Sequence, residues 1–213
     1  MEKLEDSLKF KTWKNSLIQN GIQIHSIEEL HTVRKPNGEV LFSMVKINAH
    51  DKEGRRLLPV ALLRGNFVTV VTCLIDKVTK ERFFLMVKQR RIANGDYFYE
   101  NPAGMCDSES DPWKVALKEV EEETGLIISK ENLRLLHTEN LYTSGGLLDE
   151  SGTFFACDIE MPREEIFTYH NRNTGAQNEN EFITTVIFTK EEVLANLKNT
   201  SGLLAMYLYQ DSL

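Results

Sequence analysis

The hydrophobic pattern changes its period several times along the chain. Residues 3–19 place leucines and a tryptophan near one face at helical spacing, which predicts an N-terminal helix. Residues 22–27 and 40–49 are rich in β-branched side chains, and a Pro-Asn-Gly turn lies between them. We therefore expect residues 22–63 to form a small antiparallel β subdomain.

A stronger signal starts at residue 64. The run 67–75 is apolar and β-branched, which is typical of a buried central strand. Strands mixed with helices follow it, which indicates a layered α/β domain. We expect a domain boundary between residues 1–63 and residues 64–213. The other expected elements are strands at 83–90, 97–101, about 133–142, 152–159 and 181–188, a helix at 190–197, and a last apolar stretch at 203–209.

One more helix has well-marked ends. Ser110 or Asp111 can serve as its N-cap, and Pro112 suits the first helical position. Gly125 suits the position after the last turn. Apolar residues from Trp113 onward repeat at i, i+3, i+4 and i+7, so one face of this helix is expected to pack on the core.

Three carboxylates share another face of the same helix. Glu119, Glu122 and Glu123 have the spacing i, i+3 and i+4, and like charges at that spacing cost roughly 0.2–0.5 kcal/mol for each pair. They occupy the C-terminal half of the helix, where the helix dipole disfavours negative charge. A solvated acidic face is one interpretation. A divalent cation such as Mg²⁺, which binds carboxylate and phosphate oxygens, is the other.

Composition and charge exclude several classes of protein. The chain is 41% hydrophobic and 27% charged, as in ordinary globular proteins. With 25 basic and 32 acidic residues its net charge is −7, which argues against a nucleic-acid partner. Apolar runs are far shorter than the ~20 residues that span a membrane, and the charged N-terminus does not resemble a secretory signal. The three cysteines form neither a disulfide framework nor a zinc pattern. We expect a cytoplasmic protein that does not contact a membrane.

The residues from Gly104 to Leu126 resemble the Nudix box, in which glutamates and a second glycine follow a first glycine at fixed distances. Two positions depart from the family pattern. Ser110 stands where the pattern has its first glutamate, and Lys118 stands where it has arginine. Lysine keeps the charge but loses the bidentate fork.

The resemblance extends beyond the box. Residues 99–104 look like the approach to the box in the ADP-ribose and ADP-sugar diphosphatase branch, and segments around residues 58–65 and 144–146 are similar to plant Nudix ADP-glucose diphosphatases. This resemblance implies a Nudix-type α/β/α sandwich with a mixed β-sheet, to which the small N-terminal β-rich subdomain is added.

The resemblance also implies a role for particular residues. A glutamate in a loop after the box would act as the general base, and Glu181 fits that position better than Glu179. Glu122 would share in metal binding and catalysis. The implied metal ligands, for Mg²⁺ or Mn²⁺, are the backbone carbonyl of Ala103 and the side chains of Glu119, Glu122 and Glu123.

Candidates for substrate binding come from the residues before the box. Arg91 ends a predicted strand, and arginine matches phosphate oxygens bidentately, although a surface arginine is the plain alternative. Arg64 precedes the buried strand and could serve either purpose. By family analogy Glu100 would hold a polar part of the substrate, and Gly104 would let the backbone approach phosphate.

These features predict a metal-dependent pyrophosphatase that cleaves a nucleoside diphosphate sugar, of the ADP-glucose or ADP-ribose type, to AMP and a sugar phosphate. The alternative is a degenerate Nudix domain that binds a nucleotide as a sensor without turnover. Ser110 and Lys118 favour the sensor, whereas the intact Glu119, Glu122 and Glu123 favour the enzyme. The apolar alternation in residues 22–63 leaves a face that needs burial, so we expect a homodimer. The alternative is a subdomain that folds against the core of its own chain.

Overall fold

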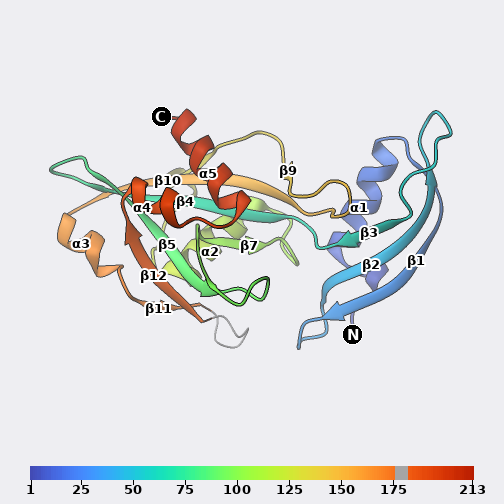
Figure 1. Ribbon diagram of the computed structural model, residues 1–213, viewed down its shortest axis with the longest axis horizontal. Helices are drawn as coiled ribbons and strands as arrows, with labels where there is room; N and C mark the ends of the chain where they lie inside the picture. Colours follow the sequence, from blue (N-terminus) through green and yellow to red (C-terminus); the bar gives the residue numbers. More distant parts are fainter. Residues whose placement is uncertain (176–181) are drawn as a thin grey trace. The chain divides into compact units, whose positions relative to one another are not determined.

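The structure is a computed structural model that describes residues 1–175 and 182–213 of the chain (Figure 1). The described residues form two compact units. The first unit comprises Met1–Phe67, Met105–Ser110 and Leu141–Gly152, and the second comprises Val68–Gly104, Asp111–Asn140 and Thr153–Leu213. The first unit therefore gathers separate stretches of the chain, and the domain boundary expected at residue 63 stays a prediction.

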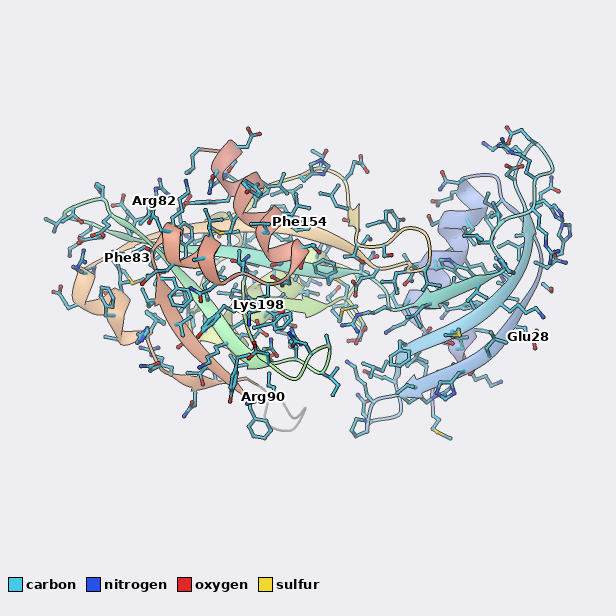
Figure 2. All side chains as sticks on the ribbon, viewed as in Figure 1. Glu28, Arg82, Phe83, Arg90, Phe154 and Lys198 are labelled. Carbon is cyan, nitrogen blue, oxygen red and sulfur yellow. The ribbon has the colours of Figure 1, made fainter. Side chains whose placement is uncertain are left out.

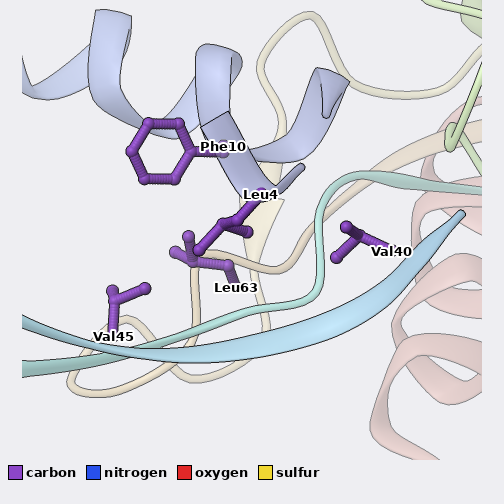
Figure 3. Packing of buried hydrophobic residues seen from close by; sticks show 5 residues of the cluster. All are labelled: Leu4, Phe10, Val40, Val45 and Leu63. Atoms are coloured by element: carbon purple, nitrogen blue, oxygen red, sulfur yellow. The ribbon is translucent and has the colours of Figure 1, made fainter. Parts of the chain in front are cut away.

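The first unit contains a three-stranded antiparallel sheet. Its strands are β1 (Gln23–Arg34), β2 (Val40–His50) and β3 (Val60–Leu63), in that order. Helix α1 (Leu8–Gln19) supplies Phe10 to the small core beneath it, where Phe10 gathers with Leu4, Val40, Val45 and Leu63 (Figure 3).

The N-terminal helix differs from the predicted one. Instead of a continuous helix over residues 3–19, a short 3₁₀ turn, η1 (Leu4–Asp6), precedes α1. Ser7 separates them because its backbone is extended, with φ −66° and ψ 146°, and its hydroxyl accepts the N–H of Phe10. A serine that caps a helix in this way starts a new helix, and the apolar period does not reveal such a break.

The second unit is built on a mixed sheet. In the part of the chain that the structure describes, this sheet has nine strands, and six of them follow the order β11-β12-β5-β4-β10-β8, while β6 pairs with β5, β7 with β4 and β9 with β10. The bounds are β4 (Phe67–Asp76), β5 (Arg82–Arg90), β6 (Tyr97–Glu100), β7 (Ala103–Met105), β8 (Leu133–Leu135), β9 (Leu141–Tyr142), β10 (Ser151–Met161), β11 (Asn173–Thr174) and β12 (Ile183–Phe188).

Helices lie on both sides of this sheet. Figure 1 shows α4 (Lys190–Asn196) and α5 (Thr200–Asp211) in front of the strands and α2 (Pro112–Thr124) behind them. Two aromatic pairs join the layers: Trp113 of α2 packs on Phe155 of β10 at 4.7 Å between ring centroids, and Tyr209 of α5 packs on Phe84 of β5 at 5.8 Å. The expected three-layer α/β/α arrangement is confirmed. The two remaining short helices are η2 (Lys130–Asn132) and α3 (Arg163–Thr168).

Strand β4 is the centre of the second unit. Every residue from Phe67 to Asp76 is buried, which confirms the predicted central strand. Cys73 and Cys157 are buried free thiols, and burial raises the pKa of Cys73 to about 11 and that of Cys157 to about 12. They therefore stay protonated near neutral pH and belong to the core.

One other sequence prediction is wrong in detail. The strand expected at 133–142 is two short strands, β8 and β9, which pair with different parts of β10. The apolar stretch 203–209, whose element type the sequence left open, is part of helix α5, and its Tyr209 side chain is buried. Burial on several sides removes the helical period from a sequence, so an apolar run of this length does not distinguish a helix from a strand. Within the described residues, no helix combines the length and the apolar character needed to cross a membrane.

The N-cap of α2 gives a stability prediction. The Asp111 carboxylate accepts the N–H of Trp113 at 3.0 Å, so of the two candidates it is Asp111 that caps the helix. We expect Asp111→Ala to lower the free energy of unfolding by about 1 kcal/mol, and Ser110→Ala to change it much less. Urea unfolding of both variants would measure this, and equal losses would contradict the assignment.

Candidate active site

Helix α2 carries the three glutamates in its last two turns. Pro112 occupies its first position, and Gly125 ends it with a left-handed φ of 72°, as the sequence predicts. The three carboxylates differ in burial. Glu123 is 3% exposed, Glu119 is half-buried and Glu122 is exposed. The helix therefore directs one glutamate into the protein and leaves another at the surface.

Glu123 is tied to strand β7. Its Oε2 accepts the backbone N–H of Ala103 at 2.9 Å, and its backbone carbonyl accepts the hydroxyl of Thr174 on β11. A buried carboxylate needs such partners, because desolvation without hydrogen bonds is costly. The contact joins a box glutamate to the residue just before the box, 20 residues away in the chain.

Glu119 lies against the next residue of β7. A Cβ atom added to Gly104 would lie 2.1 Å from Cδ of Glu119 and 2.2 Å from its Oε1. Such distances are far below van der Waals contact, so this position excludes every residue with a side chain while Glu119 keeps its place. Glu119 and Glu123 therefore converge on the segment Ala103–Gly104, which is the central feature of the site.

Glu122 has a different partner. Its carboxylate forms an i,i+4 ion pair with Lys118 at 3.0 Å, and its backbone carbonyl accepts the N–H of Gly175. Lys118 is one of the two positions that depart from the Nudix box. The lysine is thus engaged with a box glutamate, and Glu122 is directed toward it.

Two predicted substrate-binding residues form a pair just before this segment in the sequence. Arg91 Nε donates to Glu100 Oε2 at 2.8 Å, and Glu100 is only 7% exposed. Asn199 donates from Nδ2 to the other oxygen of Glu100 at 3.2 Å. The Glu100 carboxylate is held from two sides, and it orients the guanidinium of Arg91.

Asn199 is a site residue that the sequence analysis missed. It occupies the N-cap position of α5, yet its side chain makes no cap hydrogen bond, because the amide turns to Glu100 instead. Its Oδ1 is buried, has no hydrogen-bond partner among the described residues, and lies against Gly202, where an added Cβ would be 2.4 Å away. An asparagine before a helix is typical of an N-cap. No sequence pattern predicts that this asparagine donates to Glu100 instead.

The remaining predicted residues are less well defined by the structure. Arg64 belongs to the first unit, where its Nε forms an ion pair with Glu150 at 2.5 Å. Glu179 and Glu181 lie outside the described residues. The roles of all three stay predictions, as do those of Ala103, Gly104, Arg91, Glu100, Glu119, Glu122 and Glu123.

The donor set around Ala103–Gly104 fits a hard divalent cation. Carboxylate and backbone carbonyl oxygens are the ligands that Mg²⁺ and Mn²⁺ prefer, and the missing side chain at Gly104 lets the Glu119 carboxylate approach this segment closely. Among the described residues, however, no group of three or more His, Cys, Asp or Glu side chains is already arranged to hold a metal ion. The Glu122 carboxylate is paired with Lys118, and that of Glu123 accepts the N–H of Ala103.

Comparisons with known proteins identify the family of the chain. Residues 66–205, more than half of the chain, match the family profile described as the NUDIX domain. A curated relative, Nudix hydrolase 14, chloroplastic, of Arabidopsis thaliana, is 26% identical over 220 residues, which cover 96% of this chain and 71% of the relative. The solved crystal structure of an ADP compounds hydrolase superposes with a TM-score of 0.63 at 14% identity, covering 90% of this chain and 93% of that one.

The chain therefore belongs to the Nudix family of hydrolases, which act on pyrophosphate bonds and generally use divalent metal ions. The solved structure establishes the fold, a mixed α/β Nudix sandwich, and the separate N-terminal three-stranded sheet is present here as the sequence predicts.

Proposed function

We propose that this Nudix hydrolase cleaves the pyrophosphate bond of an ADP-sugar or ADP-ribose and yields AMP and a sugar phosphate. The observation that carries the proposal is the convergence of Glu119 and Glu123 on Ala103–Gly104. The Arg91–Glu100–Asn199 cluster also supports the proposal, because Glu100 lies shortly before Ala103–Gly104 in the chain. The likeness to the solved ADP compounds hydrolase supports the choice of substrate class.

The residues of the site would divide the work as follows. Bound Mg²⁺ or Mn²⁺ supplies charge neutralisation and activation of water. Glu119, Glu122, Glu123 and the carbonyl of Ala103 hold the ions. Glu181, or Glu179, takes the proton of the attacking water.

Arg91 would bind a phosphate oxygen of the substrate. Its Nε is already fixed by Glu100, so the planar guanidinium is oriented before substrate arrives. Lysine lacks this fork. We expect Arg91→Lys to raise KM about tenfold with a smaller change in kcat.

Arg90→Lys is the matched control for that variant. Arg90, which is labelled in Figure 2, is the preceding residue. Its guanidinium packs over the ring of Tyr97 at 4.4 Å, and its Nη1 donates to the carbonyl of Gly95. KM should stay near that of the unmodified protein in this control. Equal KM values for both variants would remove Arg91 from substrate binding.

A substrate screen tests the proposed function directly. Purified full-length protein is incubated with ADP-ribose, ADP-glucose, other nucleotide sugars and dinucleotides, with Mg²⁺ or Mn²⁺, and AMP is measured by chromatography. We expect AMP from an ADP-sugar or ADP-ribose, and loss of AMP formation when a chelator removes the metal. Turnover confined to a substrate without ADP would contradict the substrate class.

The second candidate is a nucleotide sensor without turnover. One observation favours it: Lys118, where the family pattern has arginine, pairs with Glu122 and competes with a metal for that carboxylate. A sensor would bind ADP-ribose in calorimetry and release no AMP in the same sample. The screen therefore distinguishes the two candidates.

We also propose that the protein is a homodimer. The three-stranded sheet of the first unit exposes several large apolar side chains, and such patches mark interaction surfaces. Examples on β1 and β2 are Leu30, Leu41 and Met44, which are 44%, 37% and 41% exposed. We expect light scattering at micromolar concentration to give twice the 24.5 kDa mass of the chain. A monomeric mass for a sample that still turns over substrate would contradict the dimer.

A further inference from the structure

Two histidines on neighbouring strands of the first unit face one another. Nε2 of His25 on β1 and Nδ1 of His50 on β2 are 2.9 Å apart, and the ring centroids are 5.0 Å apart with the planes at 73°. At this distance the two nitrogens share one hydrogen bond, and either ring can be its donor.

A β-bulge brings His25 to this place. The register of β1 against β2 shifts between Ile24, which faces Ala49, and Ser26, which faces Asn48, so His25 is the extra residue. Bulges redirect a side chain, and they occur next to functional sites. His25 is exposed, so burial in a core does not explain its position.

We propose that His25 and His50 bind one divalent transition-metal ion of the Zn²⁺, Ni²⁺ or Cu²⁺ class, which takes the place of the shared proton. Imidazole nitrogens favour these ions. Two Zn–N bonds of about 2.0–2.1 Å in a tetrahedral arrangement hold the nitrogens about 3.3 Å apart. From 2.9 Å, that spacing needs only a small rotation of the exposed His25 ring.

Water completes the coordination of this ion. Within the described part of the chain no third His, Cys, Asp or Glu joins the pair, and the adjacent Asp51 carboxylate is occupied by the guanidinium and N–H of Arg55 and by the N–H of Glu53. The site is thus an open two-imidazole site. It differs in chemistry from the oxygen site on α2, because Mg²⁺ does not select imidazole.

Binding would join the start of β1 to the end of β2. A ligand that binds only the folded chain raises its stability by mass action. The ion would therefore hold together the long β1–β2 pair at one end, while the Lys46–Glu28 ion pair lies farther along the same two strands (Glu28 is labelled in Figure 2).

Imidazole ¹⁵N NMR tests the site directly. Zn²⁺ is titrated into the full-length protein in excess Mg²⁺, which keeps the carboxylate site supplied. We expect the resonances of His25 Nε2 and His50 Nδ1 to shift together, and Mg²⁺ alone to shift neither. A Zn²⁺ titration in which these two nitrogens do not shift, or in which only one does, would overturn the proposal.

Thermal unfolding provides the second measurement, with a matched control on the same strand. Zn²⁺ should raise the Tm of the unmodified protein and of His31→Gln, which replaces another exposed histidine of β1. His25→Gln and His50→Gln should each lose most of this increase. An undiminished Zn²⁺-dependent increase in the double variant would place the ion elsewhere and overturn the proposal.

Discussion

Glu123→Gln is expected to lower the kcat for an ADP-sugar or ADP-ribose by at least about 100-fold, as the loss of a charge that stabilises the transition state does elsewhere. The substitution keeps the shape of the side chain. The amide oxygen of glutamine can still accept the N–H of Ala103, which the carboxylate now accepts at 2.9 Å. The fold should remain intact, because one like charge fewer on α2 slightly favours the helix.

Glu121→Gln is the matched control for Glu123→Gln. Glu121 lies on the same helix but is exposed and outside the face that carries the three box glutamates. The kcat of the Glu121→Gln variant should stay within about twofold of that of the unmodified protein, because a substitution at an exposed position away from the site disturbs the fold little. Steady-state kinetics on both variants, with circular dichroism as the check of folding, would measure the difference. Equal activity of the two variants would remove α2 from catalysis.

Gly104→Ala is the second change with a large expected effect. Because the new Cβ would lie 2.1 Å from Glu119 Cδ, the Glu119 side chain has to move away. We expect kcat to fall by about 100-fold and the Mg²⁺ concentration for half-maximal activity to rise. The neighbour is the end of a flexible side chain, so Tm should change little.

A double-mutant cycle separates this cause from a general disturbance of β7. In a Glu119→Ala background the displaced carboxylate no longer exists, so Gly104→Ala should cost little additional activity. Additive losses in kcat would show that alanine at position 104 acts on something other than Glu119. The explanation that Gly104 is needed because Glu119 approaches it closely would then be wrong.

The box helix could be predicted from sequence because its determinants are local. The N-cap, Pro112 and Gly125 specify its ends, and the spacing of the glutamates specifies their common face. The difference in burial between Glu123 and Glu122 depends on β7 and on Lys118, which are tertiary and side-chain contacts. Spacing along a helix contains no information on those contacts.

The substrate-side cluster shows the same limit. Arg91 and Glu100 could be proposed from their positions at predicted strand ends, but their direct hydrogen bond is a side-chain contact that the strand register does not specify, because Glu100 lies opposite Val87 in the β5–β6 pairing. Asn199 is 99 residues away from Glu100 and reaches it only because α5 begins there. Contacts between residues so far apart in the chain depend on how the elements pack, and the hydrophobic pattern of the sequence does not predict them.

The position of bond cleavage tests the central claim most directly. The protein is incubated with ADP-ribose or ADP-glucose and Mg²⁺ in ¹⁸O-labelled water, and the products are analysed by mass spectrometry. Attack on the pyrophosphate predicts AMP and a sugar phosphate, with one ¹⁸O atom on a phosphate of one of the two products, and no products in the presence of a chelator. Intact substrate that is nevertheless bound, or ¹⁸O found in free sugar, would contradict a metal-dependent pyrophosphate hydrolysis by Glu119 and Glu123.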